Sequence, residues 1–275
     1  MRRLLMVMAV IMAVVMAVGT VSAALFNVRP VTDPPADLIG THDSTQGQWL
    51  TSGGEKSLRQ IFYDIGATTY GDDPVNTQSA AAVFTNDGSG GAVATFIIEI
   101  AQNATANKIG IYKYGDPTTR VTIFTGTDGA GTQRFVTFYL DGTVVVSDPI
   151  NGQIDSVAGF GNVFGFYLYR QEDQDTFTFY SEDDLNPNGD PQALIYQGND
   201  SDVIQIDPYS PGTFADNEWI IAFEDLTYAN SDKDFNDAVF LVESIRPVPE
   251  PATLLLLGTG LIGIAQLGRK KLRKK

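Results

Sequence analysis

The feature that most constrains this fold is a succession of short apolar runs between residues 81 and 242. The runs are rich in β-branched and aromatic residues and are bounded by glycine, asparagine, aspartate or proline, which is the pattern of strands joined by turns. Because no fixed period repeats, neither a solenoid nor a propeller is expected. We predict an all-β fold, an antiparallel β-sandwich of jelly-roll-like type. Its expected strands are residues 81–84, 93–101, 108–114, 121–124, 135–140, 143–146, 163–169, 176–180, 193–196, 203–206, 219–223 and 238–242.

Local signals also predict one hairpin turn and one short helix. Asp141 and Gly142 separate two expected strands, and this pair accepts the positive φ values of a tight type I′ turn. Ahead of the strands, a segment that resembles a capping box (residues 52–55) precedes the expected helix, and Gly66 is suited to end it. Residues 24–50 are expected to be irregular. The helical spacing is carried by Leu58, Ile61, Phe62 and Ile65.

The last two apolar runs, residues 219–223 and 238–242, enclose a strongly acidic loop. We expect these runs to pair as a hairpin, which brings the carboxylates at its mouth together. Lys233 is the only basic residue among them. Crowded carboxylates repel, so some must take up a proton, spread into water or share a cation. We predict a Ca²⁺ site formed by Glu224, Asp225, Asp232, Asp234, Asn236 and Asp237.

One alternative to this site is open. An EF-hand is disfavoured, because Asp237 stands where that loop requires glycine and no flanking helices are expected. The acidic side chains would instead face solvent if they only cap their own turn, as aspartate and asparagine commonly do. A second acidic group, within residues 172–190, is expected to form solvated loops.

Composition excludes several classes of function. Without residues 1–23 and 252–275, the chain has 10 basic and 33 acidic residues, a net charge of −23. Such a surface repels nucleic acid and anionic membranes, so no nucleic-acid partner is expected. The chain has no cysteine, which excludes disulfides and thiol catalysis, and His42 is its only histidine. No catalytic residue is assigned.

The N-terminus has the pattern of a secretory signal peptide. Arg2 and Arg3 precede an apolar stretch, and the segment VSA at residues 21–23 resembles a small-residue cleavage site. We therefore predict a signal peptide over residues 1–23. A retained membrane anchor is the alternative, and the apolar run is short for a membrane span.

The C-terminus changes character after the last strand. Residues 246–251 (RPVPEP) are expected to be extended, because proline fixes its own φ and disfavours helix in the residue before it. Residues 252–268 are predicted to form a transmembrane helix, and residues 269–275 form a basic tail. Because basic segments remain in the cytoplasm, the acidic part, residues 24–245, is placed outside it as one domain.

The motif Pro249-Glu250-Pro251, the apolar helix and the basic tail together resemble the PEP-CTERM protein-sorting signal of Gram-negative bacteria. The resemblance covers residues 246–275. It implies export after signal peptidase cleavage, transient anchoring in the inner membrane through residues 252–268, and processing by an exosortase near residues 249–251. Because such proteins occur in bacteria that make exopolysaccharide, it also implies a role at the cell surface or in the extracellular matrix.

Residues 159–243 resemble an uncharacterised all-β domain that often precedes such signals. The resemblance rests on three blocks of sequence, LNPNGD at 185–190, FEDL at 223–226 and DKDFND at 232–237. It supports the fold and the location and implies no established activity.

Three functions fit these observations. The preferred one is a non-catalytic, calcium-binding β-sandwich that associates with exopolysaccharide or acts in adhesion. A carbohydrate-active enzyme that uses two of the carboxylates is the second, and a passive structural coat protein without a ligand is the third.

Overall fold

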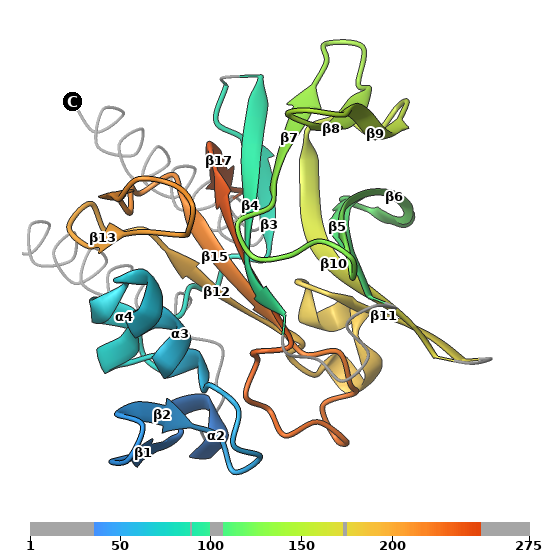
Figure 1. Cartoon of the computed structure of the whole chain (residues 1–275). Coiled ribbons are helices and arrows are strands. Elements are labelled where there is room, and N and C mark those ends of the chain that lie inside the picture. The colour runs from blue at the N-terminus through green and yellow to red at the C-terminus, as the bar shows by residue number, and fades with distance from the viewer. Residues whose placement is uncertain (1–35, 89, 100–106, 173–174, 249–275) are drawn as a thin grey trace, which may run out of the picture.

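The computed structural model describes residues 36–88, 90–99, 107–172 and 175–248 (Figure 1). The predicted signal peptide, the sorting residues Pro249, Glu250 and Pro251, and the predicted helix over residues 252–268 lie outside this part of the chain. No helix among the described residues is long and apolar enough to cross a membrane.

The larger of two main sheets has seven antiparallel strands. β15 and β16 are its second and third strands, and they form the hairpin predicted from the sequence, with Phe223 paired with Ala238. In spatial order the strands are β12 (Ala193–Gln197), β15 (Trp219–Phe223), β16 (Ala238–Glu243), β4 (Gly91–Glu99), β7 (Gln133–Phe138), β8 (Val144–Asp148) and β9 (Gly152–Val157).

The second main sheet has six antiparallel strands and packs against the first. β10 is central, because β3 and β11 pair with successive parts of one edge while β5 pairs with the other. Two small sheets pair β1 (Thr41–Asp43) with β2 (Gln48–Leu50), and β13 (Val203–Ile204) with β14 (Gly212–Thr213). The strands of the six-stranded sheet are β17 (Ile245–Pro247), β3 (Val83–Asn86), β10 (Val163–Glu172), β5 (Asn107–Lys113), β6 (Asp116–Thr125) and β11 (Asp175–Tyr180).

Aromatic side chains fill the space between the two main sheets. Phe84 packs edge-to-face on Trp219 and Phe166, with ring centroids 5.0 and 5.4 Å apart, and Phe166 reaches Phe240 on the opposite sheet. All four are buried. Together with the strand order, this packing confirms the predicted all-β fold with antiparallel sheets, and each expected strand overlaps an observed one.

A helical layer covers the other face of β12, β15 and β16. It consists of α2 (Ala36–Ile39), α3 (Leu58–Ile65) and α4 (Thr68–Asp72). A second core lies beneath it, where Phe62 of α3 packs on Tyr196 of β12 with centroids 4.7 Å apart. Alternate residues of β15 face the two cores, so the whole run WIIAF is buried. This explains why the strand reads as continuously apolar.

The N-terminal part is more regular than the sequence suggested. Residues 24–50 were expected to be irregular, yet α2, β1 and β2 fall there, and the described residues contain three α-helices where one soluble helix was predicted. The expected helix is α3, and Gly66 ends it in the left-handed region with φ +87°, as predicted. Its N-cap is Ser57, whose side chain accepts a hydrogen bond from the amide of Gln60, and the capping-box reading of residues 52–55 was therefore wrong.

The turn between β7 and β8 also differs from its prediction. Tyr139 donates its amide to the carbonyl of Thr143, so three residues form the loop. Gly142 has φ +83°, whereas Asp141 does not enter the left-handed region. The turn therefore has the longer hairpin form with glycine at its last position, rather than type I′.

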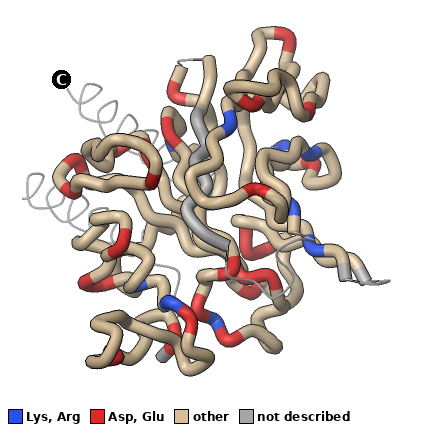
Figure 2. Tube along the Cα trace, in the orientation of Figure 1, with Lys and Arg blue, Asp and Glu red and all other residues tan. Residues whose placement is uncertain are grey.

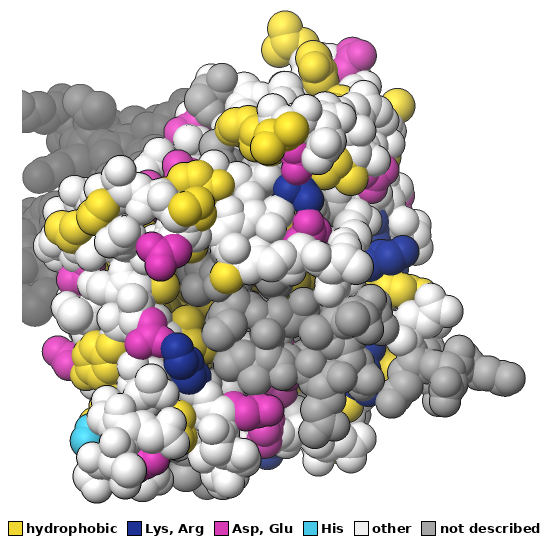
Figure 3. Space-filling view, in the orientation of Figure 1, with side chains coloured by type: hydrophobic (Ala, Val, Ile, Leu, Met, Phe, Trp, Pro, Cys, Tyr) yellow, Lys and Arg dark blue, Asp and Glu magenta, His cyan; other side chains and the backbone are white. Residues whose placement is uncertain are grey.

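Exposed apolar side chains gather at the end of the sheet formed by β7 to β9 (Figure 3). They include Tyr139, Leu140 and Ile150, which lie in the turns between these strands. This end lies opposite the acidic loop between β15 and β16 in Figure 1.

Candidate metal centre

The loop between β15 and β16 folds back onto the carboxylates at its own mouth. Asp237 Oδ2 accepts the amide of Asp225 at 2.8 Å, and Glu224 Oε1 accepts the amide of Phe235 at 2.7 Å. Asp234 Oδ1 accepts the amide of Asn236 at 3.2 Å. Carboxylates therefore cap this loop, as the alternative interpretation proposed, but each bond occupies only part of a carboxylate's acceptor capacity.

A strained backbone fixes the conformation of this loop. Lys233 and Phe235 have φ values of 63° and 53°, in the left-handed region that non-glycine residues seldom adopt. Each such residue costs about 1–3 kcal/mol unless its surroundings impose it. The Phe235 side chain is fully buried in the second core, and this burial offsets the cost. The acidic residues on either side are thereby held in place.

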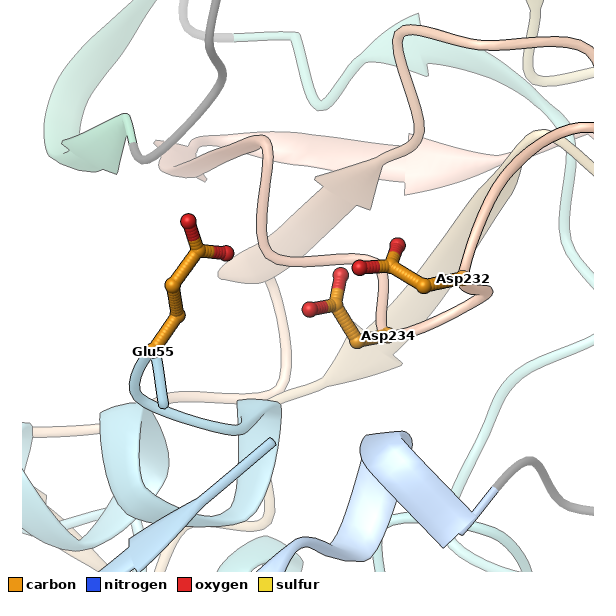
Figure 4. Close-up of side chains that lie close together, drawn as sticks. All are labelled: Glu55, Asp232 and Asp234. Carbon is orange, nitrogen blue, oxygen red and sulfur yellow. The ribbon is translucent and has the colours of Figure 1, made fainter. Parts of the chain in front are cut away.

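Three carboxylates from two distant parts of the sequence meet beside this loop (Figure 4). Asp232 and Asp234 belong to the loop, and Glu55 reaches toward them from the segment between β2 and α3. One oxygen from each lies within 4.8 Å of the others. Asp234 is buried whereas Asp232 is exposed, so the group opens to solvent on one side.

Asn236 adds a buried acceptor beside this group. Its Nδ2 donates to the carbonyl of Lys56 at 2.9 Å and to Asp234 Oδ2 at 2.6 Å. Both donors are thus satisfied, and Oδ1 has no hydrogen-bond partner among the described residues although the side chain is only 1 % exposed. A buried acceptor without a partner costs about 1–3 kcal/mol, so Oδ1 is available to an ion or to a water molecule.

Glu224 and Asp237 form a second, deeper group. Glu224 is fully buried and Asp237 is half-buried. Burial raises the pKa of Glu224 well above its usual value, and Asp237 and Asp234 raise it further by repulsion. Burial and the charge of Asp225 likewise raise the pKa of Asp237.

Asp225 differs from the other carboxylates because basic and amide side chains contact it. Arg170 Nη1 lies 3.8 Å from its carboxylate and donates to its backbone carbonyl at 3.1 Å. Asn107 Nδ2 donates to Asp225 Oδ2 at 3.2 Å. All three residues are buried. Of the six predicted metal residues, Asp225 is therefore the one that already has a counter-ion.

In the described part of the chain, acidic residues predominate around this loop (Figure 2). Lys56 pairs with Asp64 at 2.6 Å, and the ammonium of Lys233 lies over the ring of Tyr228, 4.5 Å from its centroid. Burial raises the pKa of Asp234 to about 7, and the charge of Asp232 contributes to this rise. Burial and Asp232 also raise the pKa of Glu55. The site thus favours a proton or a cation at neutral pH.

Of the residues that lie together here, the sequence analysis named Asp232, Asp234 and Asn236 and did not name Glu55. Asp232, Asp234 and Asn236 lie at one hairpin mouth as expected, whereas Glu55 was interpreted as part of a capping box. No local signal connects Glu55 with the acidic loop, because only tertiary packing brings the two segments together. In the second acidic group, Asn186 is buried and bonds to both the amide and the carbonyl of Tyr180, which gives it a structural role.

The fold and the site define an all-β domain with a carboxylate-rich hairpin, followed at once by the residues that begin the sorting segment. Residues 146–244 match the family described as a domain of unknown function (DUF4114), and residues 247–271 match the PEP-CTERM protein-sorting motif. The chain therefore has a PEP-CTERM sorting motif that follows an uncharacterised domain. No curated protein and no solved structure matches it.

The sorting motif makes the chain an exported, membrane-anchored precursor that exosortase sorts to the cell surface. It begins where the fold ends, because Pro247 is the last residue of β17 and Val248 donates its amide to the carbonyl of Val83. The six predicted metal residues lie inside the DUF4114 match, whereas Glu55 lies outside it.

Proposed function

We propose that the exported domain is a non-catalytic, calcium-stabilised protein of the cell envelope or extracellular matrix that associates with exopolysaccharide or acts in adhesion. The observation that carries this proposal is the convergence of Glu55, Asp232 and Asp234 beside the unpartnered Oδ1 of Asn236. Export places the site outside the cytoplasm, where the acidic domain meets dissolved cations.

The spacing of the oxygens suits calcium. Calcium takes six to eight oxygen ligands at about 2.3–2.6 Å, so two ligands on opposite sides of one ion are about 5 Å apart. The three carboxylate oxygens lie within 4.8 Å of one another. They supply three oxygens, Asn236 Oδ1 is the candidate for a fourth, and water supplies the rest through the exposed side. Magnesium demands a tighter octahedral arrangement and retains more of its water.

The effect of the ion would be structural. It joins the segment before α3 to the loop between β15 and β16, and so fastens the helical layer to the sheet. A ligand that binds only the folded state stabilises it by mass action, by about 2.7 kcal/mol at a hundredfold excess over its Kd. The rigid acidic surface that results is the part we expect to contact an exported polysaccharide.

The same geometry argues against an enzyme that uses Glu224 and Asp225. A catalytic acid or base must come within hydrogen-bond distance of its substrate. Glu224 is fully buried, and Asp225 is buried beside Arg170 and Asn107. Neither carboxylate is placed to contact a glycan, which supports the non-catalytic proposal.

The test is thermal unfolding of the full chain in non-ionic detergent, first with EDTA and then with millimolar calcium. We expect calcium to raise the Tm by about 5–10 °C, the equivalent of roughly 2.7 kcal/mol for a domain of this size. Asp232→Asn should abolish the rise. Asp184→Asn removes an exposed charge from a different acidic loop and should leave the rise unchanged.

Pelleting with the host's exopolysaccharide, in calcium and in EDTA, tests the second half of the proposal. We expect the protein to pellet with the polysaccharide in calcium and to stay in the supernatant in EDTA. An unchanged Tm would contradict calcium binding and favour the passive coat protein. Turnover of the polysaccharide by the wild-type protein that is lost in a folded Glu224→Gln would contradict the non-catalytic assignment.

A further inference from the structure

Tyrosine side chains gather on the outer face of the six-stranded sheet, because the residues that alternate with them on β5, β10 and β11 point into the core between the sheets. Tyr167 of β10 lies over Gly110 of β5, where an added Cβ would come within 2.8 Å of its ring. Tyr112 of β5 lies over Gly165 of β10 in the same way. The surface, which we call the tyrosine face, consists of Tyr112, Tyr167, Tyr169 and Tyr180 with Lys108 and Arg120.

Arg120 of β6 is held rigidly on the tyrosine face. Its guanidinium lies over the rings of Tyr167 and Tyr180, 5.4 and 5.6 Å from their centroids. Nε donates to the carbonyl of Pro117 at 2.7 Å, Nη1 to the hydroxyl of Thr178 at 3.0 Å, and Nη2 to the hydroxyl of Tyr180 at 2.9 Å. Three of its five N–H donors are thus used, and the side chain is half-buried. One donor on each terminal nitrogen is left in a fixed position for an anion.

Arg120 forms no ion pair with a carboxylate in the part of the chain that the structure describes, although the chain is strongly acidic. By contrast, Arg134 is paired with Asp128 and Asp148. Asp155 lies at the edge of the tyrosine face, and its two oxygens accept backbone amides instead. A rigid guanidinium without a carboxylate partner attracts an anion from outside the fold.

Lys108 adds a second positive charge to the same face. It is exposed, and its ammonium lies 5.9 Å from the ring centroid of Tyr169, its cross-strand neighbour. The neighbour of Tyr169 on the other side is Thr178, to which Arg120 donates. Tyr169 is only half-buried, so part of its ring is open to solvent. An accessible aromatic ring therefore lies between two basic side chains.

We propose that the tyrosine face binds the carboxylate-bearing sugar units of an acidic polysaccharide. The ring of Tyr169 offers an apolar surface to the C–H groups of a pyranose, while Arg120 and Lys108 bind its carboxylate. Complementary charge selects this ligand, because a neutral glycan would leave both basic side chains without a partner. The inference rests on the proposed function and deepens it by naming the class of polysaccharide and a second surface that contacts it.

The tyrosine face and the candidate metal centre would act on the same polymer. The basic residues of β5 and β6 lie on the side of the molecule away from the helical layer (Figure 2). An extended polymer reaches both surfaces, and two weak contacts with one chain reinforce each other. Pelleting with the polysaccharide therefore requires calcium, although the tyrosine face itself does not.

Isothermal titration of the full chain in non-ionic detergent and EDTA isolates the tyrosine face, because calcium is then absent. The probe is hyaluronan oligosaccharides, in which alternate sugars carry a carboxylate, and neutral dextran oligosaccharides are the comparison. We expect hyaluronan to bind, more weakly as salt is added, and dextran not to bind. Arg120→Gln should weaken hyaluronan binding about tenfold or more, and Lys108→Gln about threefold. Arg59→Gln is the matched control, since it removes a half-buried guanidinium that lies over Trp49 in the helical layer, and it should bind as wild type.

The outcomes separate this inference from the proposed function. Hyaluronan binding that is absent, equalled by dextran, or unchanged in both Arg120→Gln and Lys108→Gln would overturn the inference. Loss of the calcium-dependent rise in Tm, or of pelleting, while hyaluronan still binds would contradict the proposed function alone. If near-ultraviolet circular dichroism shows that Arg120→Gln is unfolded, Lys108→Gln and Tyr169→Leu take its place, and wild-type affinity in both would overturn the inference. Self-association of the wild type that Arg120→Gln abolishes would make this face an interface between copies and would also overturn it.

Discussion

Glu218 and Glu243 are adjacent across the hairpin at the end opposite the candidate metal centre. The pairing of Trp219 with Val242 places these two acids next to each other, and like charges in this position are destabilising. The pKa of Glu218 is raised to about 7, mainly by burial and also by repulsion from Glu243 and Asp200, against a hydrogen bond from the amide of Ala215 that lowers it. Glu218 is therefore partly protonated at neutral pH.

This pair makes the stability of the protein dependent on pH. The folded-state pKa of Glu218 is higher than the unfolded value near 4.5, so a proton on this carboxyl stabilises the folded state. This stabilisation is complete below pH 4.5 and is lost as the pH rises through 7. Allowing for its partial exposure, we expect wild type to lose about 1–2 kcal/mol relative to Glu218→Gln between pH 5 and pH 8. Urea unfolding in EDTA measures this difference, and parallel pH profiles for the two proteins would contradict it.

Some residues of the candidate metal centre could be predicted from the sequence, and others could not. Asp232, Asp234 and Asn236 are close in sequence, so their crowding at one hairpin mouth could be predicted. Glu55 could not be predicted, because only the packing of α3 on the second core brings it to the acidic loop. The counter-ion of Asp225 was also unpredictable, since Arg170 comes from β10 in the other sheet.

At the scale of elements, α3 shows how two similar serines have different roles. Ser57 is fully buried and caps the helix, and its Oγ also lies 3.1 Å from the carbonyl oxygens of Ile39 and Trp49. Ser52, which the sequence favoured as the cap, is exposed and bonds to Asp37. The position of the cap depends on the chain entering from β2, which the sequence pattern did not indicate.

We expect Ser57→Ala to destabilise the protein by about 1–2 kcal/mol, because it removes the cap and leaves buried polar groups with fewer partners. Ser52→Ala should change stability by less than about 0.5 kcal/mol. The midpoint of urea unfolding at a constant m-value measures both. Equal effects of the two substitutions would contradict the assignment of Ser57 as the cap.

The strands were predictable where burial imposed a clear pattern. β15 and β16 were identified almost to the residue because both of their faces are buried and their residues are β-branched or aromatic. β9 was missed because its sequence GQIDSV is mostly exposed at a sheet edge. β17 was missed because it is three residues long and contains Pro247, which is tolerated only at an edge.

At the scale of the whole molecule, an apolar contact and a candidate ionic contact are two of those that connect the helical layer to the sheets. The second core is apolar, and Phe62 and Tyr196 contact each other there without any ion. The candidate metal centre is the other connection, and it joins the segment before α3 to the loop between β15 and β16. Loss of calcium should therefore loosen these two segments together while the layer remains attached.

Hydrogen exchange of the full chain in non-ionic detergent tests this coupling. We expect removal of calcium with EDTA to speed exchange in residues 51–57 and 226–237 by at least tenfold, which corresponds to about 1.4 kcal/mol of lost protection, because both segments bind the same ion. The amides of α3 and β10 should change little, since apolar cores hold them. Asp232→Asn should exchange rapidly in both segments even with calcium, whereas Asp184→Asn should behave as wild type. Faster exchange in only one segment would show that the ion does not bridge them, and faster exchange throughout α3 would show that the apolar core alone does not hold the layer.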